Sequence, residues 1–96
     1  MTNELFLDKT NALFRIHLTA EYDAIVRFEI RHGIYCITST KVPQALQGMG
    51  YGKVMMRALL PELERMEVKI EPLCSYVAHY LEKHPEWSHL VAQPTR

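Results

Sequence analysis

The first part of the chain alternates apolar and polar residues. Over residues 12–18 every second side chain is apolar, with Arg15 and His17 between them. A period of two is typical of a strand with one buried face. The alternation continues over residues 22–31, and residues 34–40 are rich in β-branched side chains. Short polar breaks separate the three runs, so the pattern predicts an antiparallel three-stranded meander.

The second part of the chain changes to a helical period. Met55, Leu59 and Leu63 fall on one stripe, which predicts a helix over residues 50–66. Pro61 lies inside this segment and lacks the N–H that the helix would use. We therefore expect a kink or an early end at that position.

Two more elements complete the predicted fold. Residues 68–74 predict a fourth strand, and residues 76–83 predict a second helix with Ser75 as its N-cap. A strand, a helix and a strand joined by so long a crossover form a parallel pair with a right-handed connection. We expect an α/β fold: the meander, then a β-α-β-α unit with one parallel strand pair, in a single domain over residues 1–96.

Composition restricts the classes of function. The chain has 11 basic and 11 acidic residues and no net charge, which disfavours nucleic acid as a partner. We expect no secretory signal, because Met1-Thr2-Asn3-Glu4 lacks a positive region followed by an apolar run. We expect no membrane partner, because no apolar run approaches the ~20 residues that span a bilayer. Cys36 and Cys74 are too few for a disulfide scaffold and predict reduced thiols in a cytoplasmic protein. His79, His84 and His89 are spaced by five without a cysteine pair, so we expect no metal site.

Three glycines, Gly48, Gly50 and Gly52, stand at alternate positions between the third predicted strand and the first helix. Without Cβ atoms their backbone N–H groups can approach a ligand closely, and a helix N-terminus adds unpaired donors. The segment is a candidate phosphate or pyrophosphate site, with a tight turn and close helix packing as the simpler alternative. The P-loop pattern, G-x-x-x-x-G-K-S/T, has four residues between its glycines, whereas only three separate Gly48 from Gly52. Val54 also stands where the pattern requires a serine or threonine hydroxyl. The dinucleotide pattern needs its third glycine one residue later.

A resemblance to a known family is carried by residues 47–52. They read Gln-Gly-Met-Gly-Tyr-Gly and match the acetyl-CoA loop, R/Q-x-x-G-x-G/A, of the GNAT superfamily of N-acetyltransferases. Flanking segments are similar to small single-domain GNAT-like proteins, whose second core strand ends in a cysteine: Val42-Pro43, residues 72–78 and residues 84–87. The resemblance covers residues 14–91 and implies a GNAT-like fold.

The resemblance also implies an activity and a site. The protein would bind acetyl-CoA and move its acetyl group to an amine, on a small molecule or on another protein. The pantetheine arm would run along the backbone of three residues: Thr40, Lys41 and Val42. The loop residues that would contact the cofactor, with the pyrophosphate on the later amides, are Gln47, Gly48, Met49, Gly50, Tyr51, Gly52 and Lys53. The thioester would lie near Cys74, the candidate catalytic residue, with Tyr76 and Tyr80 as walls of an acyl pocket.

Two departures from the family keep an alternative open. The small proteins carry His-Thr before Val-Pro, whereas this chain has Ser39-Thr40, so any role of that histidine is missing. Larger members place a tyrosine acid on the last helix, and the equivalent count from Cys74 reaches Leu81. Cys74 is either a small buried hydrophobe or a thiol activated by a helix N-terminus, which would relay the acetyl group or line the site. The alternative function is a non-catalytic CoA-binding or protein-interaction module on a GNAT-like fold.

Overall fold

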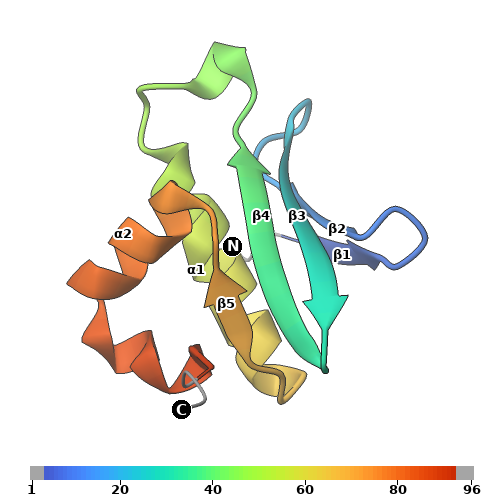
Figure 1. The fold of residues 1–96 in the computed structure, drawn as a ribbon. Coiled ribbons are helices and arrows are strands. Elements are labelled where there is room, and N and C mark those ends of the chain that lie inside the picture. Colours follow the sequence, from blue (N-terminus) through green and yellow to red (C-terminus); the bar gives the residue numbers. More distant parts are fainter. Residues whose placement is uncertain (1–3, 93–96) are drawn as a thin grey trace.

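The computed structural model describes residues 4–92 of the chain. Residues 1–3, on which the expectation of no secretory signal partly rests, lie outside the described part. The elements, shown in Figure 1, are β1 (Leu5–Asp8), β2 (Leu13–His17), β3 (Asp23–Arg31), β4 (Ile34–Lys41), the 3₁₀ turn η1 (Gln44–Leu46), α1 (Tyr51–Arg65), β5 (Ile70–Pro72), α2 (Ser75–Lys83) and η2 (Pro85–Leu90). Over the described residues, no helix combines the length and the apolar character needed to cross a bilayer.

A five-stranded sheet in the order β1-β2-β3-β4-β5 forms the centre of the fold. β1 to β4 are antiparallel neighbours, and β5 lies parallel to β4. The predicted α/β fold with one parallel pair is therefore confirmed. The meander, however, has four strands instead of three, because Leu5–Asp8 pairs with β2. A four-residue edge strand is too short to show an alternation in the sequence.

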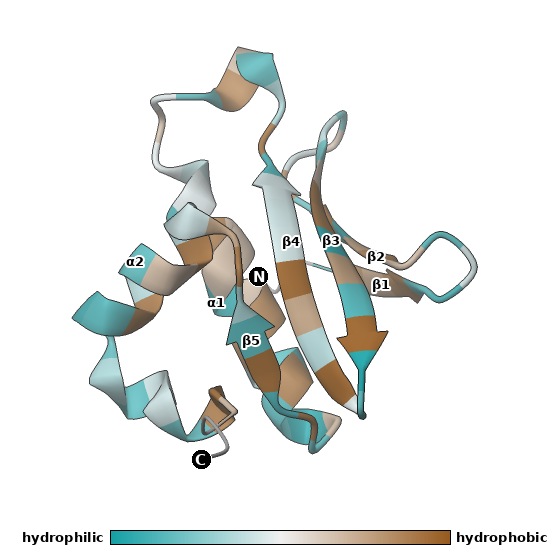
Figure 2. Cartoon of the chain, viewed as in Figure 1, coloured by the Kyte–Doolittle hydropathy of each residue, from teal (hydrophilic) through white to brown (hydrophobic). Residues whose placement is uncertain are grey.

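One face of the sheet is covered by α1, which passes behind β4 and β5 in Figure 1. The largest fully buried side chains come from the sheet, α1 and α2: Phe14, Ile16, Val26, Cys36, Ile37, Met55, Met56, Leu59, Leu60, Leu63, Ile70 and Val77. Figure 2 shows the matching apolar residues along the central strands. The other face carries exposed side chains, including Arg15, Arg27 and Glu29. One-sided burial of this kind fixes the register of β2 and β3, whereas β4 buries the consecutive residues Tyr35, Cys36 and Ile37 and is covered on both faces there.

Two local predictions are wrong, the early end at Pro61 and the N-cap at Ser75. α1 continues past Pro61 to Arg65, and the kink expected there as the alternative stays a prediction. The carbonyl of Arg57 loses its helical donor, but Arg57 and Pro61 both face solvent, where water can take the place of that donor. At the start of α2 the N-cap is Cys74, and Ser75 is already the first helical residue.

Candidate functional site

The three glycines between β4 and α1 have two different roles. Gly48 and Gly50 have φ angles of +81° and +84°, in the left-handed region that side chains avoid. A Cβ at either position would meet open space, so the backbone conformation alone requires glycine there. Gly52 has an ordinary φ, but its Cβ would lie 2.5 Å from the hydroxyl oxygen of Tyr76. Gly52 therefore allows α2 to approach the start of α1.

The loop presents backbone donors that the rest of the fold does not use. Four N–H groups have no backbone acceptor among the described residues: those of Gly48, Gly50, Tyr51 and Gly52. Met49 and Lys53 differ, because their N–H groups donate to carbonyls of the same segment at 3.3 Å. The first turn of α1 contains no acidic residue. Together the unused donors and the helix dipole can bind an anion such as a phosphate.

Gln47 holds the two ends of the loop together. Its side-chain amide donates to the carbonyl of Val42 at 3.0 Å. The same residue that matches the family pattern thus braces the glycine segment against the end of β4. Its predicted contact with a cofactor stays a prediction.

β4 parts from β5 next to this loop. The carbonyl of Ile37 accepts hydrogen bonds from the N–H groups of Leu73 and Cys74, at 3.0 and 2.9 Å, and the pairing of the two strands ends there. The pairing of β3 with β4 shifts register directly afterwards, leaving Thr38 as an extra residue in β4. A bulge of this kind bends its strand. From Thr38 to Lys41, β4 has a strand partner on one edge only among the described residues.

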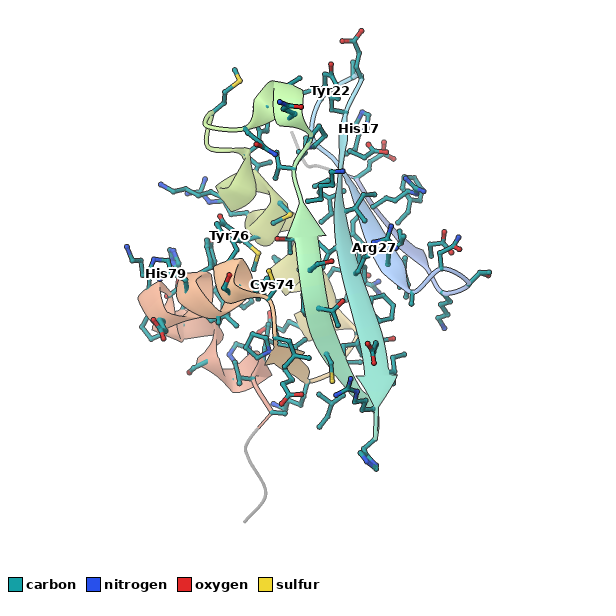
Figure 3. The ribbon with its side chains drawn as sticks, turned by 45° about the horizontal axis from the view of Figure 1, so that its top comes forward. His17, Tyr22, Arg27, Cys74, Tyr76 and His79 are labelled. Carbon is teal, nitrogen blue, oxygen red and sulfur yellow. The ribbon has the colours of Figure 1, made fainter. Side chains whose placement is uncertain are left out.

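Cys74 lies at this fork and is partly buried. Its Sγ is 3.5 Å from Oγ1 of Thr40, and Figure 3 labels Cys74 at the start of α2, beside the sheet. The N–H groups of Tyr76 and Val77 are directed at the sulfur, although neither makes a capping hydrogen bond. Burial raises the pKa of the Cys74 thiol, but the Thr40 hydroxyl and these amides outweigh it and hold the pKa below its usual value. A lowered pKa increases the thiolate fraction, which is the reactive form of a cysteine.

Cys36 offers a contrast within the same protein. It is fully buried in β4, and its Sγ is 3.5 Å from a carboxylate oxygen of Glu71. Burial and the negative charge of Glu71 both raise the pKa of this thiol.

This difference predicts selective alkylation. With substoichiometric iodoacetamide at neutral pH, Cys74 should be modified well before Cys36, because the lowered pKa gives it the larger thiolate fraction. As pH rises, the Cys74 rate should increase earlier than the Cys36 rate. Thr40→Val should slow the reaction of Cys74 by removing the hydroxyl that stabilises the thiolate. Peptide mass spectrometry measures both sites, and equal rates for the two cysteines would contradict the assignment.

Two tyrosines of α2 lie near the glycine loop in different ways. The hydroxyl of Tyr76 packs against Gly52, and burial together with the nearby Tyr80 raises its pKa, so it remains a neutral donor. The ring of Tyr80 is buried, with its centroid 6.5 Å from that of Tyr76. Both tyrosines therefore lie in the first turns of α2, after its N-cap Cys74. Their contact with an acyl group stays a prediction.

A hollow that was not predicted from the sequence lies between β3 and the segment that joins β4 to α1. It measures about 520 Å³ and is lined by Asp23, Ile25, Lys41, Pro43, Gln44 and Gln47. Ile25 of β3 is the register partner of Lys41, which places the hollow beside the end of β4. Asp23 and Ile25 of β3 could be assigned to this hollow only from the register of β3 against β4, which the sequence does not show. No three His, Cys, Asp or Glu side chains within residues 4–92 gather as a metal site.

Comparison with known proteins agrees with the resemblance. A search of the curated proteins gave no match. The family model described as GCN5-related N-acetyl-transferase matches residues 13–90, which include every strand from β2 onward, the glycine loop and Cys74. The chain therefore belongs to this family of GCN5-related N-acetyl-transferases.

Proposed function

We propose that the protein transfers an acetyl group from acetyl-CoA to an amine, and that Cys74 carries the acetyl group between them. The observation that supports this most is the position of Cys74. Its thiol, with a lowered pKa, lies at the fork between β4 and β5, beside Thr40 on the unpaired edge of β4. Family membership supports acetyl transfer in general.

The cofactor would use two sets of backbone groups. Its pyrophosphate would accept hydrogen bonds from the unused N–H groups of the loop, at Gly48, Gly50, Tyr51 and Gly52. Its pantetheine amides would pair with the free edge of β4 near Thr40, as an added strand does. This placement would bring the thioester to the fork where Cys74 lies.

The transfer would proceed in two substitutions at the acetyl carbon. The Cys74 thiolate attacks the thioester carbonyl, forms a carbon–sulfur bond, and expels CoA as a thiolate that takes a proton from water. The amine then attacks the acyl-cysteine, Cys74 leaves as a thiolate, and the amine nitrogen releases its proton to water. The hydroxyl of Thr40 and the amides at the start of α2 would stabilise the Cys74 thiolate before the first step and after the second.

The acceptor would be an exposed amine. In larger GNAT enzymes a helical pair builds much of the acceptor site, but here β1 and β2 are joined by residues 9–12 alone. The fork would therefore be open to a bulky acceptor, such as an amine on another protein.

One observation favours the non-catalytic alternative. Within residues 4–92, the Cys74 thiol interacts with the Thr40 hydroxyl and with backbone amides, and with no imidazole or carboxylate that could act as a base. Isothermal titration with acetyl-CoA, followed by intact-mass measurement, separates the two functions. We expect saturable binding and a gain of one acetyl group on the protein. Binding without any acetylated protein or acetylated amine would establish a CoA-binding module. No binding would reject both acetyl transfer and CoA binding and leave the protein-interaction module.

A further inference from the structure

A small cationic pocket lies between the start of α1 and α2. It shares Lys53, Tyr76 and Tyr80 with the site predicted from the sequence and adds His79, Lys83 and His84. It measures about 170 Å³ and is lined by Lys53, Tyr76, His79, Tyr80, Lys83 and His84. The α2 positions are spaced by three and four residues, so they share one side of the helix. Val77 and Leu81 lie outside this side and are buried in the core. Of the pocket's α2 residues, Tyr80 also packs in the core, whereas Tyr76, His79 and Lys83 are not part of it.

The charge of this pocket differs from that of the whole chain, which is neutral. Two ammonium groups and two imidazoles line it, and no carboxylate does. Glu86, which does not line the pocket, is 3.4 Å from Nδ1 of His84. The pocket thus matches an anionic ligand.

Lys53 is difficult to explain by the stability of α1. It lies in the first turn of the helix, where a positive charge is unfavourable with the helix dipole, and no acidic residue in that turn offsets it. An anion held between Lys53 and Lys83 would remove this conflict.

The walls of the pocket are aromatic and border the glycine loop. The rings of Tyr80 and His84 are stacked, with centroids 4.1 Å apart and an interplanar angle of 22°. Tyr76 reaches from this face to Gly52. In Figure 3, Cys74, Tyr76 and His79 follow one another from the sheet outward along α2.

We propose that this pocket binds the 3′-phosphate on the nucleoside end of the cofactor, so that the protein distinguishes acetyl-CoA from acetyl-dephospho-CoA. The inference rests on the proposed function, because it takes the pyrophosphate to lie on the glycine loop, which the pocket borders through Lys53 and Tyr76. The pocket is smaller than a typical site for a whole ligand, which suits one phosphate group and its sugar. Lysine ammonium groups bind phosphate as point charges.

The test compares the affinities of the two cofactors by isothermal titration. The wild-type protein should bind acetyl-CoA about five- to tenfold more tightly than acetyl-dephospho-CoA, as expected for one or two charge-assisted contacts. Lys83→Gln and Lys53→Gln should each reduce this ratio toward one, mainly by weakening acetyl-CoA. Added salt should shrink the wild-type ratio, because both lysines are exposed.

Lys9→Gln is the matched control, since it removes the same charge from the turn between β1 and β2. It should leave the ratio unchanged, and circular dichroism should show all three variants folded. Equal wild-type affinities for the two cofactors would overturn the 3′-phosphate site and leave acetyl transfer standing. An unchanged affinity ratio between the two cofactors in both Lys83→Gln and Lys53→Gln would also overturn the 3′-phosphate site and leave acetyl transfer standing. No binding of either cofactor would overturn both proposals.

Discussion

Replacing Cys74 with serine should abolish the acetylated protein and slow amine acetylation by about 100-fold or more. The expected loss is large because the reactive form is the thiolate, and the surroundings of Cys74 lower the pKa of a thiol. A serine hydroxyl in the same place has a far higher pKa and no nearby base among the recorded contacts. Intact-mass measurement after incubation with acetyl-CoA reports the first effect, and initial rates with an amine acceptor report the second.

Cys36→Ser is the matched control. Its sulfur is buried and lies next to Glu71, and burial and that carboxylate raise its pKa, so its loss should leave the acetyl adduct and the rate of acetylation per folded molecule unchanged. Acetyl-CoA affinity should also be retained in Cys74→Ser, since the pyrophosphate donors lie elsewhere. If Cys74→Ser acetylates amines at the wild-type rate, the amine attacks the thioester directly and the covalent relay is wrong.

Replacing Gly50 with alanine should weaken acetyl-CoA binding by about tenfold. Gly50 is the N-cap of α1 with φ +84°, a conformation that costs a residue with a Cβ about 1–2 kcal/mol. The added methyl group would meet nothing within 4 Å, so the effect is one of backbone conformation and not of a clash. The loop would relax toward negative φ and turn its unused N–H groups away from the pyrophosphate. About 1.4 kcal/mol corresponds to tenfold in affinity.

Gly33 offers an unusually close control. It has φ +78° and open space around its missing Cβ, but it lies in the turn between β3 and β4. Gly33→Ala should cost similar stability in a thermal or denaturant melt and leave the dissociation constant for acetyl-CoA unchanged. Equal losses of affinity in the two variants would mean that the effect comes from stability alone, and the loop would lose its assigned role.

The elements that the sequence predicted well are those with a strong period. The alternation over residues 22–31 and the apolar stripe of α1 are both set by burial on one side, which the sequence displays directly. β1 was missed because four residues carry too little pattern. Pro61 was given too much weight, because a proline on a solvent-facing side of a helix leaves its orphan carbonyl to water.

The candidate site divides in the same way. The glycine loop and Cys74 could be identified locally, from glycine spacing and from a thiol before a helix. The contact of the Thr40 hydroxyl with Cys74 could not be identified in this way. It depends on the bulge at Thr38 and on the end of the β4–β5 pairing at Ile37, neither of which the sequence shows. The cationic pocket also escaped detection, since Lys53 and Lys83 are 30 positions apart and meet only through the packing of α2 against the start of α1.

The most direct test of the account is a nuclear magnetic resonance titration of the ¹⁵N-labelled protein with acetyl-CoA. We expect saturable shifts of the amide signals of Gly48, Gly50, Tyr51 and Gly52, together with those of Thr40 and Cys74. Acetyl-pantetheine, which lacks the pyrophosphate, should shift the signals at the fork but not those of the loop. Saturable binding that leaves the loop amides unmoved would contradict the claim that this segment holds the diphosphate.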